Sequence, residues 1–546
     1  MQLATTHKPR TSALSVETLD MLQQRRELRR DANVRNSIEF AELCKTIRKA
    51  VQHDLQQHHL QLIDEAIRTG TLRRARSGLA EGRRQITTLG RNDGTRAFMT
   101  AEIMDIVRDF YESLYRSSQQ SNTSDADDDD TSDVENDNAL PFLESEIRQA
   151  LQKMKSETAE QAGFRQNFST IDHIHAVNEL IEKTTEYNLP LFMVLVDYEK
   201  AFDSVENTSI WQALKRQNVP SNIITILKSI YRTSKSTIHI GDASASVKVQ
   251  RGVRQGDTIS PRLFTACLRE ALNSLNWQNK GINIDGCYLS HLAFADDVVI
   301  ISHSYSQLCQ MVKELAAASL QVGLKINIKK TKLLANCCSG RTPIKICREE
   351  IAQVDEFVYL GQLISFPRDH MRKIRCRIQA GWNAFRKYRQ YFTAQKIAIM
   401  HKRRLFNMCI VPSILFGAEI WALTKVAETR LATTKRWMER RIIGARLIDR
   451  ISNERLREIT KIRDLVQAAR QRKWRWARKV AMMSQDRWAR RLTEWQPRIG
   501  RHDVGRPWRR WRDVVSKTAG VQWMQAAHCD KEWSWIGEAF IRNECD

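Results

Sequence analysis

The sequence predicts an α+β protein in which a central βαββαβ unit lies between two helical regions. Three observations lead to this fold class. Short apolar segments alternate with helical segments between residues 189 and 365. Apolar residues recur at helical spacing among many charges in residues 15–115, and again beyond residue 370. With 546 residues, the chain is also long enough for two to four structural units.

The first 116 residues are predicted to form a helical, basic region, because apolar residues recur there at helical spacing among many charges, with few helix breakers. Residues 117–138 are polar and acidic and contain a run of aspartates. Such a run could suggest a metal site, but nothing near it would fix the geometry of a ligand set. A disordered acidic linker is the better interpretation.

The charge balance favours a polyanionic partner. Lysine and arginine total 87 against 63 acidic residues, which gives a net charge of +24 and a pI near 9.7. Such an excess is typical of nucleic-acid-binding proteins, although charge alone does not exclude a merely basic surface. No signal peptide or transmembrane segment is expected, so we predict an intracellular protein with no membrane partner, either nuclear or in a cytoplasmic ribonucleoprotein. The eleven cysteines form no C-x-x-C pair and are predicted to be buried free thiols.

The central unit is built from segments whose apolar patterns change from strand to helix in a fixed order. The order is a strand running into a helix (191–205), a helix (223–234), a hairpin entering a loop (236–257), an amphipathic helix (260–277), a strand–turn–strand (291–304), a helix (304–324) and a returning strand (326–337). This order corresponds to a split α/β sandwich of the βαββαβ type.

Three aspartates are expected to meet in this sheet. Asp197 ends the first strand, and Asp296 and Asp297 lie in the turn of HLAFADDVVIIS. Three neighbouring carboxylates repel one another, and divalent cations relieve that repulsion. Oxygen ligands favour Mg²⁺ or Mn²⁺, and two such ions are the apparatus of nucleotidyl transfer. An exposed Asp-Asp turn is the competing interpretation of this motif taken alone.

Five motifs in a fixed order distinguish these interpretations: VDYEKAFDSV, GVRQGDTISPRLF, AFADDVVI, GLKINIKKTK and FVYLGQLIS. With them, the chain resembles the reverse transcriptases of non-LTR (LINE-type) retrotransposons over residues 138–480. The resemblance implies a right-hand polymerase whose parts are a fingers remnant (139–188), a palm (189–365), a helical thumb (366–480) and a Trp/Arg-rich C-terminal region (481–546).

The resemblance also implies the activity and its metal ligands. It predicts an RNA-directed DNA polymerase that uses two Mg²⁺ ions (Mn²⁺ is possible), an RNA template, a DNA primer and dNTPs. Asp197 and Asp296 are the implied principal metal ligands and Asp297 an accessory one. The carbonyl of Tyr198 is an implied additional ligand.

Substrate-binding residues follow from the same motifs. Phe202 corresponds to the steric gate that selects dNTPs, although a core phenylalanine is the alternative. Gln255 and Gly256 correspond to a loop that contacts the nucleotide and template. Either Lys330 or Lys332 corresponds to a basic residue near the triphosphate, and an exposed lysine is equally compatible with each.

Two further segments match the family. FVYLG (357–361) corresponds to the primer-gripping hairpin, and residues 160–175 to a template-side segment in which Arg165 is a candidate phosphate contact. His173 and His175 in that segment are expected to be structural.

The chain departs from the family pattern in two places. No endonuclease domain is expected before the polymerase, and residues 150–159 run directly into the template-side segment, so the fingers are predicted to be incomplete. The alternative function is therefore a catalytically impaired, retroelement-derived protein that binds nucleic acid, because misplaced substrate costs rate steeply.

The C-terminal region interleaves arginines with tryptophans at 472–479 and 505–513. Arginines can neutralise phosphates while tryptophans stack on unpaired bases. For 472–479, an amphipathic helix with core tryptophans is an equally good interpretation. Gly505 and Pro507 break helical continuity, so an exposed binding loop is predicted for the second segment. Its candidate nucleic-acid-binding residues are Arg506, Trp508, Arg509, Arg510, Trp511 and Arg512.

Overall fold

The structure is a computed structural model. It describes residues 13–29, 38–69, 88–91, 93–117, 158–240, 243–337, 343–346, 348–501 and 509–542. The chain divides into two compact units. The first contains residues 1–84, 377–415 and 429–465, and the second contains 85–376, 416–428 and 466–546. These units do not follow the expected domain boundaries, because segments far apart in the sequence join each unit. The expected acidic linker lies almost entirely outside the described residues.

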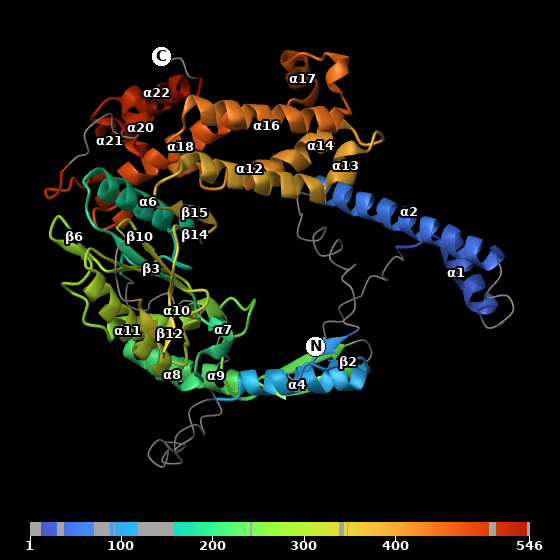
Figure 1. The fold of residues 1–546 in the computed structure, drawn as a ribbon, viewed down its shortest axis with the longest axis horizontal. Coiled ribbons are helices and arrows are strands. Elements are labelled where there is room, and N and C mark those ends of the chain that lie inside the picture. Colours follow the sequence, from blue (N-terminus) through green and yellow to red (C-terminus); the bar gives the residue numbers. More distant parts are fainter. Residues whose placement is uncertain are drawn as a thin grey trace, which may run out of the picture. The chain divides into compact units, whose positions relative to one another are not determined.

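A five-stranded sheet forms the centre of the second unit (Figure 1). Its strand order is β13-β10-β3-β9-β8, and the four main strands pair antiparallel. The register places Val194 of β3 opposite Ile300 of β9 and Leu333 of β10. The four main strands with the helices between them have the order that a βαββαβ segment produces. The strands are β3 (Phe192–Val196), β8 (His291–Phe294), β9 (Asp297–Ser302), β10 (Lys332–Ala335) and β13 (Ala352–Gln353).

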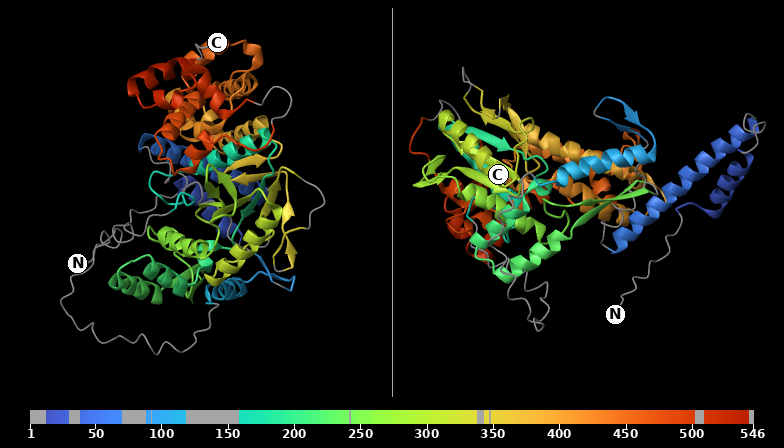
Figure 2. Two further views of the ribbon diagram at one scale, coloured as in Figure 1. Left: turned by 90° about the vertical axis from the view of Figure 1, so that its left-hand side faces the viewer. Right: turned by 90° about the horizontal axis from the view of Figure 1, so that it is seen from below.

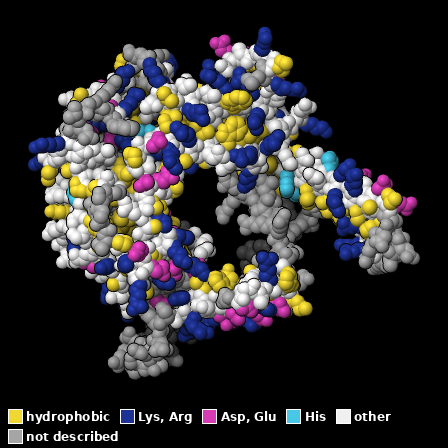
Figure 3. Space-filling view, in the orientation of Figure 1, with side chains coloured by type: hydrophobic (Ala, Val, Ile, Leu, Met, Phe, Trp, Pro, Cys, Tyr) yellow, Lys and Arg dark blue, Asp and Glu magenta, His cyan; other side chains and the backbone are white. Residues whose placement is uncertain are grey.

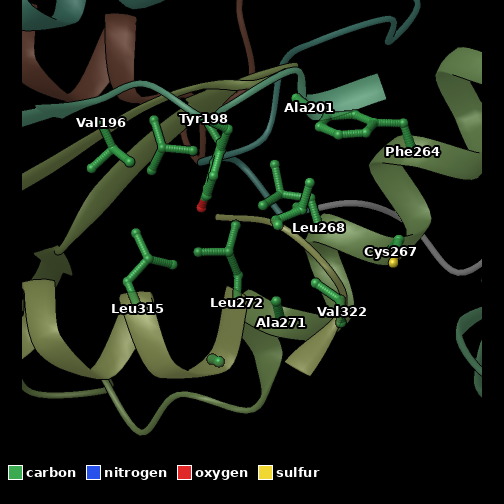
Figure 4. Packing of buried hydrophobic residues seen from close by; sticks show 14 of the residues in the cluster. Val196, Tyr198, Ala201, Phe264, Cys267, Leu268, Ala271, Leu272, Leu315 and Val322 are labelled. Carbon is green, nitrogen blue, oxygen red and sulfur yellow. The ribbon is translucent and has the colours of Figure 1, made fainter. Parts of the chain in front are cut away.

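Helices cover one face of this sheet. Alternate residues of β3 point to that face and pack against the helices. Phe192, Val194 and Val196 belong to one hydrophobic cluster with residues of the covering helices. In Figure 4, Val196 and Tyr198 face Leu272 and Leu315. The helices are α7 (Ala201–Ser204), α8 (Asn207–Arg216), α9 (Ser221–Arg232), α10 (Ser260–Asn273) and α11 (Tyr305–Gln321).

The opposite face packs against α6 (Thr170–Glu186), α19 (Trp488–Glu494) and a hairpin of β14 (Glu356–Tyr359) and β15 (Gln362–Ser365). Met193 and Leu195 supply the strand side chains for this second cluster. All residues of α6 from Asp172 to Thr184 are buried. A helix buried on all sides has a further layer packed against it, and here the C-terminal residues supply that layer.

The C-terminal segment forms a tryptophan-rich cluster around Trp474, Trp511, Trp523 and Trp533. Trp474 and Trp533 stack with ring centroids 4.0 Å apart. Residues 472–479 therefore form an amphipathic helix with buried tryptophans, which was one of the two interpretations of that segment. The elements are α18 (Leu465–Ala481), α20 (Trp511–Ala519), α21 (Trp523–Ala526) and α22 (Asp530–Arg542).

Smaller elements complete the second unit. Helix α4 (Thr100–Tyr115) lies along a hairpin of β4 (Lys235–Ile240) and β5 (Ala243–Lys248), as Figure 2 shows. The remaining elements are β1 (Leu89–Gly90), β2 (Arg96–Ala97), β6 (Ile282–Ile284), β7 (Cys287–Leu289), β11 (Lys345–Ile346), β12 (Glu349–Glu350) and the 3₁₀ turn η3 (Ala418–Ile420).

The first unit is helical and basic. Figure 3 shows lysine and arginine side chains over α12, α14 and α16. Phe385 and Phe392 stack in its interior with centroids 4.6 Å apart. Its elements are α1 (Val16–Leu28), α2 (Ile38–Thr69), α12 (His370–Lys387, which begins in the second unit), α13 (Arg389–Thr393), α14 (Ile399–Leu405), η2 (Phe406–Ile410), α15 (Val411–Ile414), α16 (Lys425–Ile443), η4 (Leu447–Asp449) and α17 (Asn453–Thr460).

Two bulk expectations can be compared with these elements. Among the described residues, none of the helices combines the length and apolar composition needed to cross a bilayer. The described cysteines are free, as predicted, but only Cys267 and Cys409 of them are buried. The expectation of buried thiols is therefore wrong for the other described cysteines, which lie nearer the surface.

Candidate active site

Asp197 is held at the end of the central strand β3. Its backbone N–H donates to the Thr331 hydroxyl at 3.2 Å, and its carbonyl accepts from Asn327 N–H at 2.7 Å. These two bonds fix the backbone from which the carboxylate projects. Thr331 was not identified from the sequence, although its place two residues before the apolar part of the returning strand is a usable signal.

Asp296 and Asp297 lie at the tip of the β8–β9 hairpin. Phe294 pairs with Asp297, so Ala295 and Asp296 form a two-residue turn. Ala295 has a φ of 55°, in the left-handed region that costs an L-residue roughly 1–2 kcal/mol. A two-residue hairpin loop requires a positive φ at its first position, so the tight turn itself accounts for this conformation.

The sheet register brings the two aspartate sites together. Val196 pairs with Val298, so the next residues outward on β3 and β9 are Asp197 and Asp297. Burial, together with the negative charges of Asp296 and Asp197, raises the pKa of Asp297 to about 6. The register and these charge effects place Asp197, Asp296 and Asp297 at the same end of the sheet.

The donor atoms of this cluster suit a hard divalent cation. All are oxygens, and Oδ1 of Asp197 is buried without a hydrogen-bond donor. The charge nearest to it is the Lys330 ammonium, 3.6 Å from that oxygen. Within the described ranges, no group of three or more His, Cys, Asp or Glu side chains is arranged closely enough to hold a metal ion. The carboxylates thus suit a divalent ion by their oxygen chemistry and by the unsatisfied Asp197 oxygen, but their side chains do not form a closed ligand set.

Tyr198 is anchored within the core beside the cluster. Its hydroxyl forms a hydrogen bond with Ser319 at 2.9 Å. Residue 198 bridges Ile326, but the two backbone bonds of that bridge involve the Asp197 carbonyl and the Glu199 N–H. The Tyr198 carbonyl takes part in neither of them.

Phe202 is half buried next to the hydrophobic core. Its ring stacks on Phe264 at 4.7 Å and meets Phe164 edge to face at 6.4 Å. The ring therefore belongs partly to the core, as the alternative interpretation holds, while its partial exposure leaves part of it accessible.

Gln255 and Gly256 occupy the loop that follows the β4–β5 hairpin. The Gln255 amide donates to both carboxylate oxygens of Asp203 at 3.3 Å. Gly256 has a φ of 89° with open space where a Cβ would lie, so the loop needs glycine for its backbone conformation and leaves its surface accessible.

The two candidate lysines face different partners. The Lys330 side chain is 67% exposed and its ammonium lies near Asp197. The Lys332 ammonium instead donates to the Lys329 carbonyl at 2.6 Å. The structure thus brings Lys330, and not Lys332, to the carboxylate cluster.

Residues 158–169 form a loop that pairs with the edge strand β8. Arg165 donates to the Thr158 carbonyl at 2.7 Å and lies over the Phe168 ring, so its guanidinium serves the loop itself. His173 and His175 are buried, and burial lowers the pKa of His173 to about 4. These positions agree with structural roles for the histidines.

The hairpin at 357–361 is present as β14 and β15. Gly361 has a φ of 77° at its turn, Val358 is 60% exposed and Tyr359 is buried. The Tyr359 hydroxyl lies 3.5 Å from Nδ1 of His173. The hairpin is therefore anchored on one side and exposed on the other.

The proposed binding loop of the C-terminal region divides into different environments. Arg506 and Trp508 lie outside the described residues. Arg509 is exposed, Arg512 is half buried, and Arg510 is paired with Glu186 of α6. Trp511 is 2% exposed, and its indole N–H donates to the Glu419 carbonyl at 2.8 Å. Base stacking by Trp511 is therefore inconsistent with this packing, because its ring belongs to the core.

Comparison with known proteins identifies the sequence family. The profile of the reverse transcriptase (RNA-dependent DNA polymerase) family matches residues 142–364. A transposon-derived protein of Caenorhabditis elegans is 30% identical over 272 residues, which are 46% of this chain and 96% of that protein. The Pol polyprotein of the type-1 retrotransposable element R2 of Nasonia vitripennis is 31% identical over 31% of this chain and 18% of its own length.

Structural similarity was also found to telomerase from Candida tropicalis in complex with a fragment of telomeric RNA. The identity is 13% and the TM-score 0.31, with 65% of this chain and 57% of that chain covered.

The chain spans nearly all of the nematode relative but under a fifth of the R2 polyprotein. By its profile match and its relatives, the chain belongs to the reverse transcriptase family, with homologues among the non-LTR retrotransposons.

Proposed function

We propose that this chain is an RNA-directed DNA polymerase that extends a DNA primer on an RNA template, using dNTPs. The observation that carries the proposal is the convergence of Asp197 with the Asp296–Asp297 turn at one end of the sheet. Burial and the neighbouring negative charges of Asp296 and Asp197 both raise the pKa of Asp297. A cluster of carboxylates that resists full ionisation gains most from a divalent cation.

In this proposal, Asp197 and Asp296 hold two Mg²⁺ ions, with Asp297 and the Tyr198 carbonyl as accessory ligands. The ions, when bound, supply charge stabilisation and activation of the primer hydroxyl. Lys330 places a cation where the triphosphate would lie, and Gln255 and Gly256 offer an accessible loop to the nucleotide.

Two apolar features support the assignment of substrates. The partly exposed ring of Phe202 would meet the 2′ position of an incoming sugar, backed by the Phe264 ring. The exposed Val358 on the anchored β14–β15 hairpin would contact the primer strand. The right-hand arrangement of palm, thumb and incomplete fingers is part of the same proposal. The five-stranded sheet that contains β8 and β9 would form the palm.

The basic first unit would bind the duplex of template and primer. Its arginines can neutralise phosphates and release counterions, which makes binding depend on salt. Exposed examples are Arg389, Arg404, Arg430, Arg441 and Arg446.

Primer extension on an RNA template tests this function directly. The parent is expected to extend the primer only with Mg²⁺ or Mn²⁺, and Asp197→Asn and Asp296→Asn are expected to abolish extension. Asp285→Asn is the matched control, because Asp285 is an exposed turn aspartate in the β6–β7 hairpin with a φ of 48°. Extension that survives in either of the first two variants contradicts the metal-site assignment. Salt-dependent RNA binding without extension by the parent would favour the impaired, binding-only alternative.

A further inference from the structure

The turn that carries Asp296 and Asp297 is supported by a segment that lies outside the main sheet. Gln161 forms a parallel bridge with Ala293 of β8. Ala293 N–H donates to the Glu160 carbonyl at 2.9 Å, and Ala162 N–H donates to the Ala293 carbonyl at 3.0 Å. Residues 160–162 therefore act as a short additional strand at the edge where the catalytic hairpin would otherwise be unpaired.

This support continues to the turn itself. A Cβ added at Gly163 would collide with the backbone N of Ala295, so the two backbones are in direct contact. Ala295 is the residue with the costly left-handed φ, immediately before Asp296. The supporting segment therefore touches the turn at the residue whose conformation places Asp296 at the tip.

The supporting segment is itself held by the start of α19. The indole N–H of Trp488 donates to a carboxylate oxygen of Glu160 at 3.0 Å, and Trp488 is only 4% exposed. Arg487 donates to the Asn167 carbonyl at 3.1 Å and pairs with Asp172, so it holds the other end of the same loop. A hydrogen bond to a charged acceptor in a poorly hydrated place is stronger than a neutral one.

The far end of α19 is fixed as well. The buried Lys183 ammonium donates to the carbonyls of Leu492, Thr493 and Trp495. A cation at the C-terminal end of a helix satisfies its free carbonyls and complements its dipole. Helix α19 is thus tied to α6 at its end and to the Glu160 loop at its start.

We propose that Trp488 is a positioning residue for the Asp296–Asp297 turn and acts through Glu160. Its indole N–H fixes the Glu160 carboxylate, and the backbone of residues 160–163 transmits that position to Ala293 and Ala295. The C-terminal region would then set the placement of catalytic carboxylates more than 190 residues earlier in the chain. The kinetic consequence rests on the proposed polymerase function, whereas the structural consequence does not.

Trp488→Phe tests the hydrogen bond while keeping a buried ring. Trp474→Phe is the matched control, because Trp474 is also 4% exposed and also donates one indole hydrogen bond, to the Trp533 carbonyl at 3.0 Å. By hydrogen exchange without metal or substrate, the Ala162 and Ala293 amides should exchange about tenfold faster in Trp488→Phe and at the parent rate in Trp474→Phe. Equal exchange rates in all three proteins would overturn the proposal, whether or not the parent polymerises.

Substitutions at Glu160 test the route. Glu160→Ala should reproduce the faster exchange, Glu160→Gln should retain the parent rate because its amide oxygen still accepts, and Trp488→Phe/Glu160→Ala should match either single variant. In primer extension, kcat should fall on the order of 10-fold in Trp488→Phe with the dNTP KM changed less than twofold, because catalytic placement and not nucleotide binding is altered. Additive effects in the double variant, or an equal kcat loss in Trp474→Phe, would overturn the proposal.

Discussion

The imidazole of His175 and the indole of Trp511 meet edge to face, with ring centroids 4.6 Å apart and planes at 74°. His175 lies on α6, directly behind the central sheet, and Trp511 begins α20 in the C-terminal region. His175 also bonds Thr493 of α19 at 2.8 Å. This contact makes the C-terminal region part of the core of the sheet-containing unit, so its buried tryptophans contribute mainly to stability.

Trp511→Ala is expected to lower the free energy of unfolding by about 3–5 kcal/mol, because it removes a fully buried indole and leaves a cavity. Urea denaturation followed by far-UV circular dichroism measures the change. Trp535→Ala is the control: Trp535 is 77% exposed in the same region and should change stability by less than about 0.5 kcal/mol. Equal losses in both variants would contradict the core placement of Trp511.

His175 should make stability fall as the pH is lowered below neutral. Burial, together with the positive charges of Lys473 and Lys183, lowers the pKa of His175 to about 3. In the unfolded chain the histidine has a pKa near 6.5. As the pH falls, the unfolded chain therefore binds a proton at His175 that the folded state does not bind. This stabilisation is fully present above pH 6.5 and is lost progressively as the pH falls below that value. The loss amounts to about 2 kcal/mol at pH 5.

The unfolding free energy at pH 7 minus that at pH 5 should be lower, by about 2 kcal/mol, in His175→Gln than in the parent. Comparing the two proteins is necessary because Glu179 acts with the opposite sign. Burial, together with the charge of Glu182, raises the pKa of Glu179 to about 8, so the stabilising contribution of Glu179 is lost as pH rises through that value. An identical pH dependence in parent and variant would show that His175 does not titrate on unfolding in this range.

Phe202→Ala should reduce discrimination against ribonucleotides by tenfold or more, on the order of 1.4 kcal/mol, if its ring excludes the 2′-hydroxyl. The ratio of kcat/KM for dNTP and rNTP in primer extension measures this effect. Phe98→Ala, which removes a 67% exposed ring outside the sheet, should leave the ratio unchanged. A constant ratio in Phe202→Ala would assign the ring to the core alone.

Lys330→Met should weaken dNTP use by about tenfold, because it removes the cation that lies 3.6 Å from Asp197. Lys332→Met is the matched control, since its ammonium bonds a backbone carbonyl instead. The dNTP KM and kcat in Mg²⁺-dependent extension distinguish the two variants. A larger loss in Lys332→Met would reverse the assignment.

The sequence was sufficient to predict features with a short period. Short continuous apolar runs specified the strands at Phe192–Val196 and Asp297–Ser302, and turn chemistry placed Asp296 and Asp297 at a hairpin tip. Because two such buried strands pair within one sheet, the approach of Asp197 to that turn could also be predicted.

Contacts between distant segments decided the rest. From the sequence, Lys330 and Lys332 could equally well point towards Asp197. The hydrogen bonds from Lys330 N–H and Thr331 N–H to the Asn327 carbonyl fix the backbone of this turn and so decide between them. The Arg-Trp pattern around Trp511 is compatible with an exposed loop or a buried helix start, and only packing against His175, more than 330 residues away, makes it core. Burial depends on how the layers assemble. The Trp511 indole gains more free energy by packing against α6, away from water, than it would by staying exposed to bind a base.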